Sequence, residues 1–313
     1  MPPKPLPLSE AIGSVPMARR RVGDMSVTWL VILAPLACLV GALLTWPTLR
    51  PHFADVALFL VIFVISGLGV TVGYHRTFAH RAMRPRRALK IVLAIAGSIS
   101  LEGGPLTWSA MHRVHHKRSD RPGDPHSPVG HGGGMLGSLR GFLHAHVGWI
   151  VNPRVPDRSD HVDDLAADRD LRIVNGFFPL IAVATFLVPL ALGAVLHRTW
   201  AGALGTLMWA GVLRVTLTQH VTFSINSICH MVGRRSFKTT DRSRNVWWLA
   251  LPSFGESWHN NHHAFPRLAR HGLDRGQVDL SALVIRLFEK LRWADQIEWP
   301  DPAILERKRL RAA

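Results

Sequence analysis

The sequence predicts an all-α integral membrane protein with four transmembrane helices and a helical cap on the cytosolic side. The first observation behind this fold class is that 48% of the 313 residues are hydrophobic and concentrate in long runs. A helix needs roughly 20 apolar residues to cross the hydrocarbon core of a bilayer. The second observation is that most Arg and Lys residues lie between and after these runs, where a water-facing cap would be.

Four runs have the length of a transmembrane helix, and we expect spans at residues 27–48, 54–74, 173–196 and 200–229. A further apolar stretch, residues 88–101, has only about 14 residues, which is the length of a buried, re-entrant or interfacial segment. We place this stretch on or partly in the cytosolic leaflet. If it crossed the membrane, the histidines before and after it would face opposite sides.

The distribution of positive charge predicts the orientation. Residues 1–25 form a Pro-rich arm with a triple arginine near its end, directly ahead of the first run. Because positively charged loops stay on the cytosolic side, we expect both termini and residues 75–172 and 230–313 in the cytosol. Residues 26–313 then form a single domain. The excess of Arg over Lys favours a GC-rich bacterial source, and therefore a bacterial plasma membrane.

Composition also excludes some classes of protein. The net charge of +16 fits the predicted orientation and would attract anionic lipid headgroups. No basic recognition module is visible, so we expect no nucleic-acid partner. The two cysteines, Cys38 and Cys229, both fall in predicted spans, which argues against a disulfide framework and against thiolate metal ligands.

Eight histidines fall into three tight clusters, and they predict a metal site in the cap. The clusters are His75 and His80; His112, His115 and His116; and His259, His262 and His263. Neutral imidazole is the commonest protein ligand for transition metals. Eight ligands are more than one ion can use, so we expect two metal ions. A single cluster could be an ordinary pair on a helix surface, but three regularly spaced clusters are hard to explain by chance.

The spacing within each cluster predicts local geometry. Residues three and four apart share one face of a helix, so the second and third clusters can each present three imidazoles to one side. His75 and His80 are five apart, which does not align on a regular helix. We therefore expect either two directions of approach to the metals or a helix end between them.

A ninth candidate ligand is His230, just after the last run, with Asn226 one helical turn before it. The alternative is a histidine at the membrane interface. We expect the remaining histidines to be structural or exposed: His52, His126, His131, His144, His146, His161, His197, His220 and His271. All-nitrogen ligation suits Fe, Zn, Cu or Ni. A metal pair at the end of an apolar bundle favours oxygen chemistry on a lipid-like substrate, and therefore iron.

The histidine motifs carry a family resemblance. The segments HRTFAH, HRVHHK and HNNHHAFP, with GGP before the second and GDPHSP after it, resemble the membrane fatty acyl-CoA desaturase family. The resemblance runs from about Ser66 to Trp299. It implies a non-haem di-iron enzyme that uses O2 and two electrons. The implied reaction introduces a cis double bond, typically at carbon 9, into a saturated acyl-CoA.

The resemblance also implies roles for individual residues. It implies nine histidine ligands, and an asparagine that reaches a metal through water: His75, His80, His112, His115, His116, His230, His259, His262, His263 and Asn226. We expect no catalytic residue beyond these. Carboxylates near the motifs should hold the imidazoles in one tautomer; the candidates are Glu102, Asp120, Asp124 and Glu256. Candidate substrate contacts are Trp108, Arg113, Lys117 and Trp258.

Departures from the family pattern leave the acyl carrier open. Ala110 and Met111 stand where eukaryotic members carry Arg-Asp, so acyl-lipid remains an alternative to acyl-CoA. A basic set could meet a CoA phosphate or form a solvated face at the membrane: Arg84, Arg86, Arg87, Lys90, Arg113, Lys117 and Arg118. No haem, flavin or nicotinamide domain is visible. We therefore expect an external electron donor, a ferredoxin or a b-type cytochrome with an NAD(P)H reductase.

Two other functions compete with this one. A hydroxylase or other oxidase of the same di-iron membrane group would share the histidine motifs but insert oxygen. A metal transporter would place ionisable residues at mid-membrane, and these runs hold almost none. Finally, apolar residues recur at helical spacing over 280–291, after the good N-cap Asp279. This predicts an amphipathic helix on the cap or at the headgroups.

Overall fold

The computed structural model describes residues 17–19, 40–41, 50–152, 154–156 and 161–310. In these residues the chain is predominantly helical, as the sequence predicts. The Pro-rich arm and the first predicted span, residues 27–48, lie almost wholly outside the described residues.

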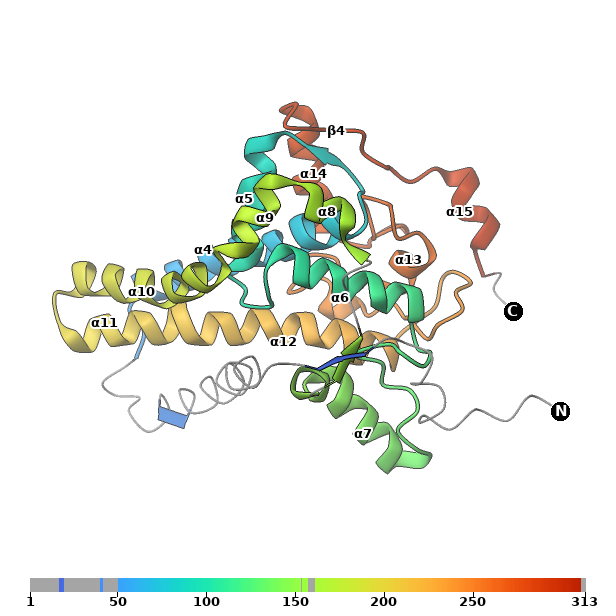
Figure 1. The fold of residues 1–313 in the computed structure, drawn as a ribbon, viewed down its shortest axis with the longest axis horizontal. Helices are drawn as coiled ribbons and strands as arrows, with labels where there is room; N and C mark the ends of the chain where they lie inside the picture. Colours follow the sequence, from blue (N-terminus) through green and yellow to red (C-terminus); the bar gives the residue numbers. More distant parts are fainter. Residues whose placement is uncertain (1–16, 20–39, 42–49, 153, 157–160, 311–313) are drawn as a thin grey trace.

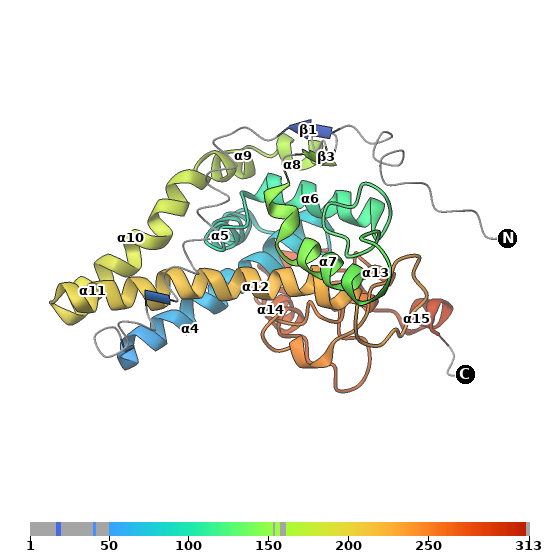
Figure 2. The ribbon, with the colours of Figure 1, turned by 90° about the horizontal axis from the view of Figure 1, so that it is seen from below.

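Three helices in the described part of the chain are long and apolar enough to cross a membrane. They are Phe53–Ala79, Phe178–His197 and Trp200–His230. They correspond to three of the four predicted runs. All three extend to the same side of the molecule, and the remaining helices gather at their other end as a cap (Figures 1 and 2).

The first and third of these helices are not regular α-helices throughout. The first consists of α4, Phe53–Leu68, followed without a break by a π-helix, η1, Gly69–Ala79. The third runs through four parts: α11 Trp200–Thr206, the π-helix η4 Leu207–Leu213, α12 Arg214–Ser227 and the 3-10 turn η5 Ile228–His230. π-Helical turns often occur at functional sites. Here η1 carries the first histidine motif.

The predicted start of the third span at residue 173 is wrong. The structure has a separate cap helix, α9 Arg169–Gly176, before α10 Phe178–His197. Asp168 caps α9 by accepting from the backbone N–H groups of Asp170 and Leu171, at 2.9 and 3.2 Å. The first turn of α10 contains a proline, which suits a helix start because it has no N–H to leave unpaired. Apolar composition alone does not show such a boundary.

The cap is built from short helices and two small antiparallel pairings. Its helices are α5 Arg87–Ser98, α6 Pro105–Arg118, α7 Gly134–His146, η2 Gly148–Val151, α8 Asp163–Ala167, α9, η6 Trp247–Leu249, α13 His259–Ala264, α14 Leu280–Lys290 and α15 Pro302–Lys308. Strand β1 Met17–Arg19 pairs with β3 Arg154–Pro156, and β2 Arg84–Pro85 pairs with β4 Ala294–Asp295. The predicted amphipathic helix is confirmed as α14, and its N-cap is Asp279.

The core of the cap forms where α5 packs against η1. Tyr74, Phe78 and Leu93 are buried there. Gly69 permits this close approach, because a Cβ on it would lie 2.2 Å from the backbone carbon of Ala96. The histidine-bearing π-helix is thus clamped against α5.

A buried ion-pair network ties η1 to the C-terminal part of the cap. The guanidinium of Arg76 is fully buried, and it lies 2.9 Å from Glu256 and 3.0 Å from Asp279. Arg76 also donates to the backbone carbonyl of Ala269 at 2.7 Å. Asp279 accepts from the backbone N–H of Ala282 at 2.9 Å and so caps α14. One carboxylate therefore serves both a buried cation and a helix start.

Substituting Asp279→Ala should destabilise the protein far more than an ordinary capping mutation. It leaves Arg76 without one of its two counter-ions, a loss that costs about 3–5 kcal/mol when the charge is buried. Asp301→Ala is the matched control, because Asp301 caps α15 at the surface and should cost about 0.5–2 kcal/mol. Thermal unfolding of the two purified variants in the same detergent measures the difference. Equal losses would show that the Arg76 pair contributes little.

Candidate metal centre

The fold brings all nine predicted histidine ligands together in two groups. Within each group the ring nitrogens lie within 4.8 Å of one another: His75, His80, His112, His116 and His262 in the first, and His115, His230, His259 and His263 in the second. Helices α6 and α13 each contribute histidines to both groups. The two groups therefore adjoin each other, as a two-metal site requires.

The π-helix explains the five-residue spacing of the first motif. In η1 the backbone N–H of His80 donates to the carbonyl of His75 at 3.1 Å, which is the i to i+5 pattern of a π-helix. The two rings consequently lie on the same side, with centroids 4.9 Å apart. The helix ends at Ala79 with His80 as its C-cap. A helix end does lie between the two histidines, and yet both join the same group.

The imidazoles point their Nε2 atoms at common centres. In the first group the Nε2 of His262 lies 3.0 Å from that of His75 and 2.9 Å from that of His116. In the second group the Nε2 atoms of His230 and His259 are 3.0 Å apart. Two nitrogens bound to one ion at about 2.1 Å and at about 90–110° would be about 3.0–3.4 Å apart. The spacing fits shared metal ions.

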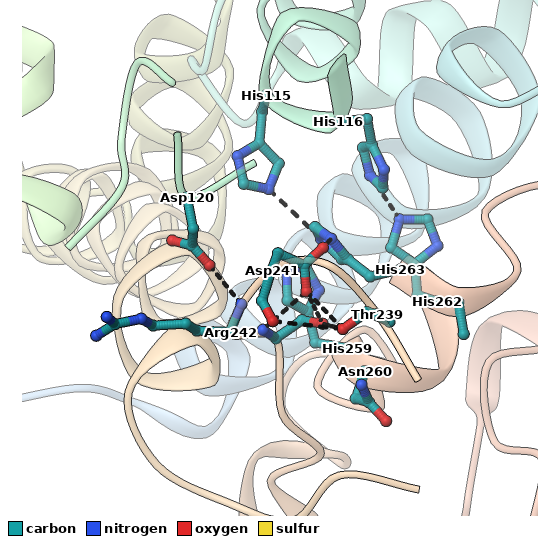
Figure 3. A network of polar contacts seen from close by, with 12 residues as sticks. His115, His116, Asp120, Thr239, Asp241, Arg242, His259, Asn260, His262 and His263 are labelled. Carbon is teal, nitrogen blue, oxygen red and sulfur yellow. Dashed lines mark hydrogen bonds and ion pairs between the residues drawn. The ribbon is translucent and has the colours of Figure 1, made fainter. Parts of the chain in front are cut away.

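Carboxylates hold three imidazoles of the second group at their other nitrogen. His230 Nδ1 lies 2.8 Å from Asp120, His115 Nδ1 lies 3.0 Å from Asp124, and a third such pair joins His263 and Asp241 at 2.7 Å (Figure 3). In the first group His75 Nδ1 contacts Glu256 in the same way.

These contacts fix where the protons sit. An imidazole that donates from Nδ1 to a carboxylate carries its lone pair on Nε2. His115 and His263 are both held in this way, and their Nε2 atoms face each other at 3.4 Å. Two such lone pairs repel each other unless a cation lies between them. The donor set therefore fits metal ions.

Burial keeps the site in the form that binds a metal. It lowers the pKa of His112, His116, His259 and His262 well below the usual value, and neighbouring histidines lower it further. Burial also lowers the pKa of His263 to about 4, although Asp241 opposes this. Metal binding requires unprotonated imidazole. The apolar surroundings supply that condition for these five imidazoles, whereas at His115 burial is outweighed by Asp124, which raises the pKa.

The carboxylates stay ionised in the same environment. Burial opposes ionisation of Asp241, but its contact with His263 and its hydroxyl partners hold its pKa well below the usual range. Burial opposes ionisation of Glu256 as well, and there His75, Arg76 and His271 lower the pKa. Asp241 and Glu256 thus place fixed negative charge beside the imidazoles of His263 and His75.

The structure places three of the four predicted supporting carboxylates beside imidazoles and the fourth elsewhere. Asp120, Asp124 and Glu256 contact imidazoles, as the sequence analysis expects. Glu102 does not: it accepts from the indole N–H of Trp108 at 2.9 Å, and Trp108 stacks on His112 with ring centroids 5.0 Å apart. Glu102 therefore acts on a ligand only through Trp108.

Sequence reasoning missed Asp241 and two histidines. Asp241 lies in the loop after the last span, and its only sequence signal is that it is an acidic residue in a strongly basic stretch. His271 is buried 3.5 Å from Glu256, and His126 is buried 3.9 Å from Asp124. Both were expected to be structural or exposed. Neither histidine lies three or four residues from a histidine of the motifs, so the sequence gives no signal that they lie beside the site.

An apolar cavity ends at the histidines. Its inner end is formed by His75, His112 and His259, which come from both groups, together with Trp108 and Asn226. Apolar and small side chains from α4, η1, α12 and the loop before α13 line the rest: Phe63, Gly67, Val70, Val221, Ile225 and Phe254. The cavity thus connects the transmembrane helices with the metal centre.

The other candidate substrate contacts lie elsewhere. Trp258 is buried and donates from its indole N–H to the carbonyl of Val278 at 2.7 Å. Arg113 donates to the carbonyls of Phe78 and Ala79 and pairs with Asp164 at 2.6 Å, so its guanidinium is engaged within the protein. Neither residue lines the apolar cavity.

Most of the predicted basic set is also paired. Arg84 contacts Asp295 at 3.2 Å, Arg87 contacts Asp170 at 2.8 Å, and Lys90 lies 3.1 Å from the same Asp170. With Arg113, four of the seven residues thus have carboxylate partners. A CoA phosphate would have to displace these carboxylates to use them.

Substituting Asp124→Asn should weaken metal binding about 10–100-fold, because the amide no longer fixes the tautomer of His115. Asp164→Asn is the matched control: it makes the same chemical change at a carboxylate that pairs with Arg81 and Arg113 and touches no histidine. Competition between the purified protein and a chelator of known affinity for Fe²⁺ gives both constants. Equal weakening in the two variants would contradict the assigned role of Asp124.

A second test uses Glu102, whose pKa burial raises to about 7. Its Oε1 is buried without a hydrogen-bond partner among the described residues. Because the folded state holds this proton more tightly than the unfolded state, Glu102 should cost stability as the pH rises from about 4.5 to about 7. Glu102→Gln should therefore become more stable than wild type as the pH increases through this window. Parallel melting curves of the two proteins at several pH values test this; a constant difference would refute it.

Comparison with known proteins agrees with this site. The family model described as "Fatty acid desaturase" matches residues 51–284. The chain is 38% identical over 271 residues to a hex-5-enoyl-[acyl-carrier protein] acetylenase of Moorena producens (strain JHB), covering 86% of this chain and 84% of that protein. It is 35% identical over 291 residues to the Delta-9 acyl-lipid desaturase 1 of Arabidopsis thaliana, covering 92% and 84%. With the sn-1 stearoyl-lipid 9-desaturase of Anabaena variabilis the identity is 34% over 278 residues, covering 88% and 95%. The chain therefore belongs to the fatty acid desaturase family and is an oxidoreductase of lipid metabolism.

Proposed function

We propose that this protein uses O2 to introduce a cis double bond at carbon 9 of a saturated fatty acyl chain. The observation that carries the proposal is the apolar cavity, which ends at histidines of both groups. Every methylene of a saturated chain has similar reactivity, so the protein must choose the reacting carbons by position. A narrow cavity that ends at the metal ligands can do this.

The cofactor that we propose is a pair of iron ions. The first group would hold one ion with five imidazoles. The second group would hold the other with four, and Asn226 would reach a metal through water. When bound, the irons would activate O2, which is the oxidant that removes hydrogen from an unactivated methylene. The carboxylates at Nδ1 orient the ligands, and Trp108 packs over His112 at the inner end of the cavity.

We propose a bacterial plasma membrane as the location, with the cap and both termini in the cytosol. Three apolar helices project to one side of the cap. Their exposed surfaces carry large apolar side chains such as Leu180, Val188 and Val195, as expected of helices that contact lipid. The excess of Arg and Lys in the cap supports the orientation.

The substrate carrier that we propose is a membrane acyl-lipid. The sequence alone favours acyl-CoA, but four of the seven basic residues that could meet a CoA phosphate have carboxylate partners within the protein. Two relatives are named for acyl-lipid or stearoyl-lipid substrates, and a third is named for an acyl-carrier-protein substrate. Acyl-CoA remains the second candidate because Arg86, Lys117 and Arg118 form no ion pair among the described residues.

The reaction needs electrons from outside the chain. Reduction of O2 to two waters takes four electrons and four protons. Removal of two hydrogen atoms from the acyl chain supplies two of each. The other two electrons must come from a donor, and we propose a separate electron-transfer protein.

The first experiment is expression of the chain in a host that lacks desaturation, followed by gas chromatography and mass spectrometry of its lipids. Wild type should produce a cis-monoene whose double bond is located by derivatisation. His112→Ala and His262→Ala should abolish this product, because each removes a proposed ligand. His131→Ala, which alters a histidine outside both groups, should retain it.

The products separate the alternatives. Hydroxylated chains would favour the competing oxidase reaction, and a triple bond would favour the chemistry for which the Moorena producens relative is named. Assays of the purified protein with acyl-CoA and with acyl-lipid decide the carrier. Unchanged fatty acids, with metal bound and a donor present, would refute the fatty acyl substrate.

A further inference from the structure

A second cavity reaches the histidines from the opposite side. His116 and His263 line it. None of its lining residues is shared with the apolar cavity. Its walls come from the C-terminal end of α6, the loop after the last span, α13 and the end of α15. Figure 1 places α13 and α15 at the end of the molecule far from the hairpin of α10 and α11.

The rim of this cleft is strongly basic. Lys117, Arg121, Lys238 and Lys308 line it, and all four are exposed. Within the described part of the chain none of them forms an ion pair with a carboxylate, whereas Arg87, Lys90 and Arg113 elsewhere in the cap do. The rim thus presents four positive charges that no carboxylate of the described chain neutralises.

The only acidic residue among those that line the cleft is already engaged. Asp241 is buried and lies 2.7 Å from Nδ1 of His263, with Thr239 donating to it at 2.9 Å (Figure 3). A molecule seated in the cleft would therefore meet positive charge at the rim. At the base of the cleft the molecule would contact the carboxylate of Asp241, which itself contacts His263, or it would touch the imidazoles of His116 and His263 directly.

This arrangement suits the entry of electrons. The apolar cavity opens toward the transmembrane helices, and an acyl chain would fill it. The basic cleft is a second cavity lined by proposed metal ligands, His116 and His263. An electron from a partner bound in this cleft would need to cross only His116 or His263 to reach the metal centre. Weak electron-transfer encounters typically use small interfaces in which complementary charge steers association.

We propose that this basic cleft is the docking surface for an acidic electron-carrier protein. The inference rests on the proposed function, which requires two electrons per double bond from outside. The reduced carrier would deliver one electron per encounter and leave oxidised. Two encounters, with two protons from solvent, complete the reduction of one O2 to two waters. A lipid headgroup is the less suitable occupant, because the cleft lies at the end of the cap remote from the α10–α11 hairpin.

The test compares two double charge reversals in the full-length protein, loaded with iron and held in neutral-lipid nanodiscs. The cleft variant is Arg121→Glu with Lys238→Glu. The control is Arg86→Glu with Arg169→Glu, which makes the same change of net charge at exposed basic residues on α5 and α9. Neither pair of side chains has an ion pair among the described residues. The probe is an acidic [2Fe–2S] ferredoxin, used oxidised for binding and kept reduced by its reductase for turnover.

The cleft variant should bind ferredoxin at least ~10-fold more weakly than wild type at low ionic strength, and its KM for ferredoxin should rise by a similar factor. Its kcat at saturating ferredoxin should stay within about twofold of wild type, since no ligand changes. The control should shift binding by less than ~3-fold when both variants are also measured at about 0.1 M salt, because charges more than about 10 Å from the bound ferredoxin are then largely screened.

Several results would overturn the proposal. Equal weakening in both variants would mean that net charge alone attracts the ferredoxin. Unchanged binding in the cleft variant would place the docking surface elsewhere. Loss of binding to phosphatidylglycerol vesicles, with ferredoxin binding retained, would assign the cleft to lipid. Because the binding assay does not depend on turnover, a chain that bound ferredoxin at the cleft without making any double bond would refute the proposed reaction but not the docking surface.

Discussion

The convergence of imidazole lone pairs on two centres is the constraint on which the rest of this structure depends. Nine nitrogen donors aimed inward repel one another unless cations lie between them, so the surrounding protein must hold them in place. It does so with carboxylates at Nδ1, with close packing of η1 against α5, and with the buried network around Arg76. The carboxylates and the Arg76 network also cost free energy, because they bury charge. The apolar packing of η1 against α5 buries none.

The histidine groups could be predicted because their signal is local. Histidines three and four apart share a helix face whatever the rest of the chain does, so the motifs of α6 and α13 are readable from sequence. The span 200–229 and the helix that Asp279 caps were likewise predicted from nearby residues. The separation of α9 from α10 was not, because the predicted span followed apolar composition alone and passed over the Asn175-Gly176 pair and Pro179 that flank the turn at Phe177.

The groups that support the ligands could be predicted only in part, because their contacts are long-range. Asp120 lies near the second motif in sequence, but its imidazole partner is His230, from the end of the last span. Asp241 and His271 have no spacing to any motif that would single them out. The ion pairs of Arg87 and Arg113 with carboxylates more than fifty residues away also have no sequence signal. Such pairings follow from the topology, and a single sequence does not show topology directly.

The π-helix η1 limits the sequence changes that this segment can tolerate. Each residue in an α-helix advances the chain by about 100° around the axis, and the wider π turn is what places His75 and His80 on one side. If the segment kept its length but adopted α-helical bonding, five residues would advance the chain by about 500°, and His80 would point about 140° away from His75. Substitutions that keep the packing would leave both histidines in place. Over these eleven residues the π-helical backbone is therefore under stronger constraint than the identity of most side chains.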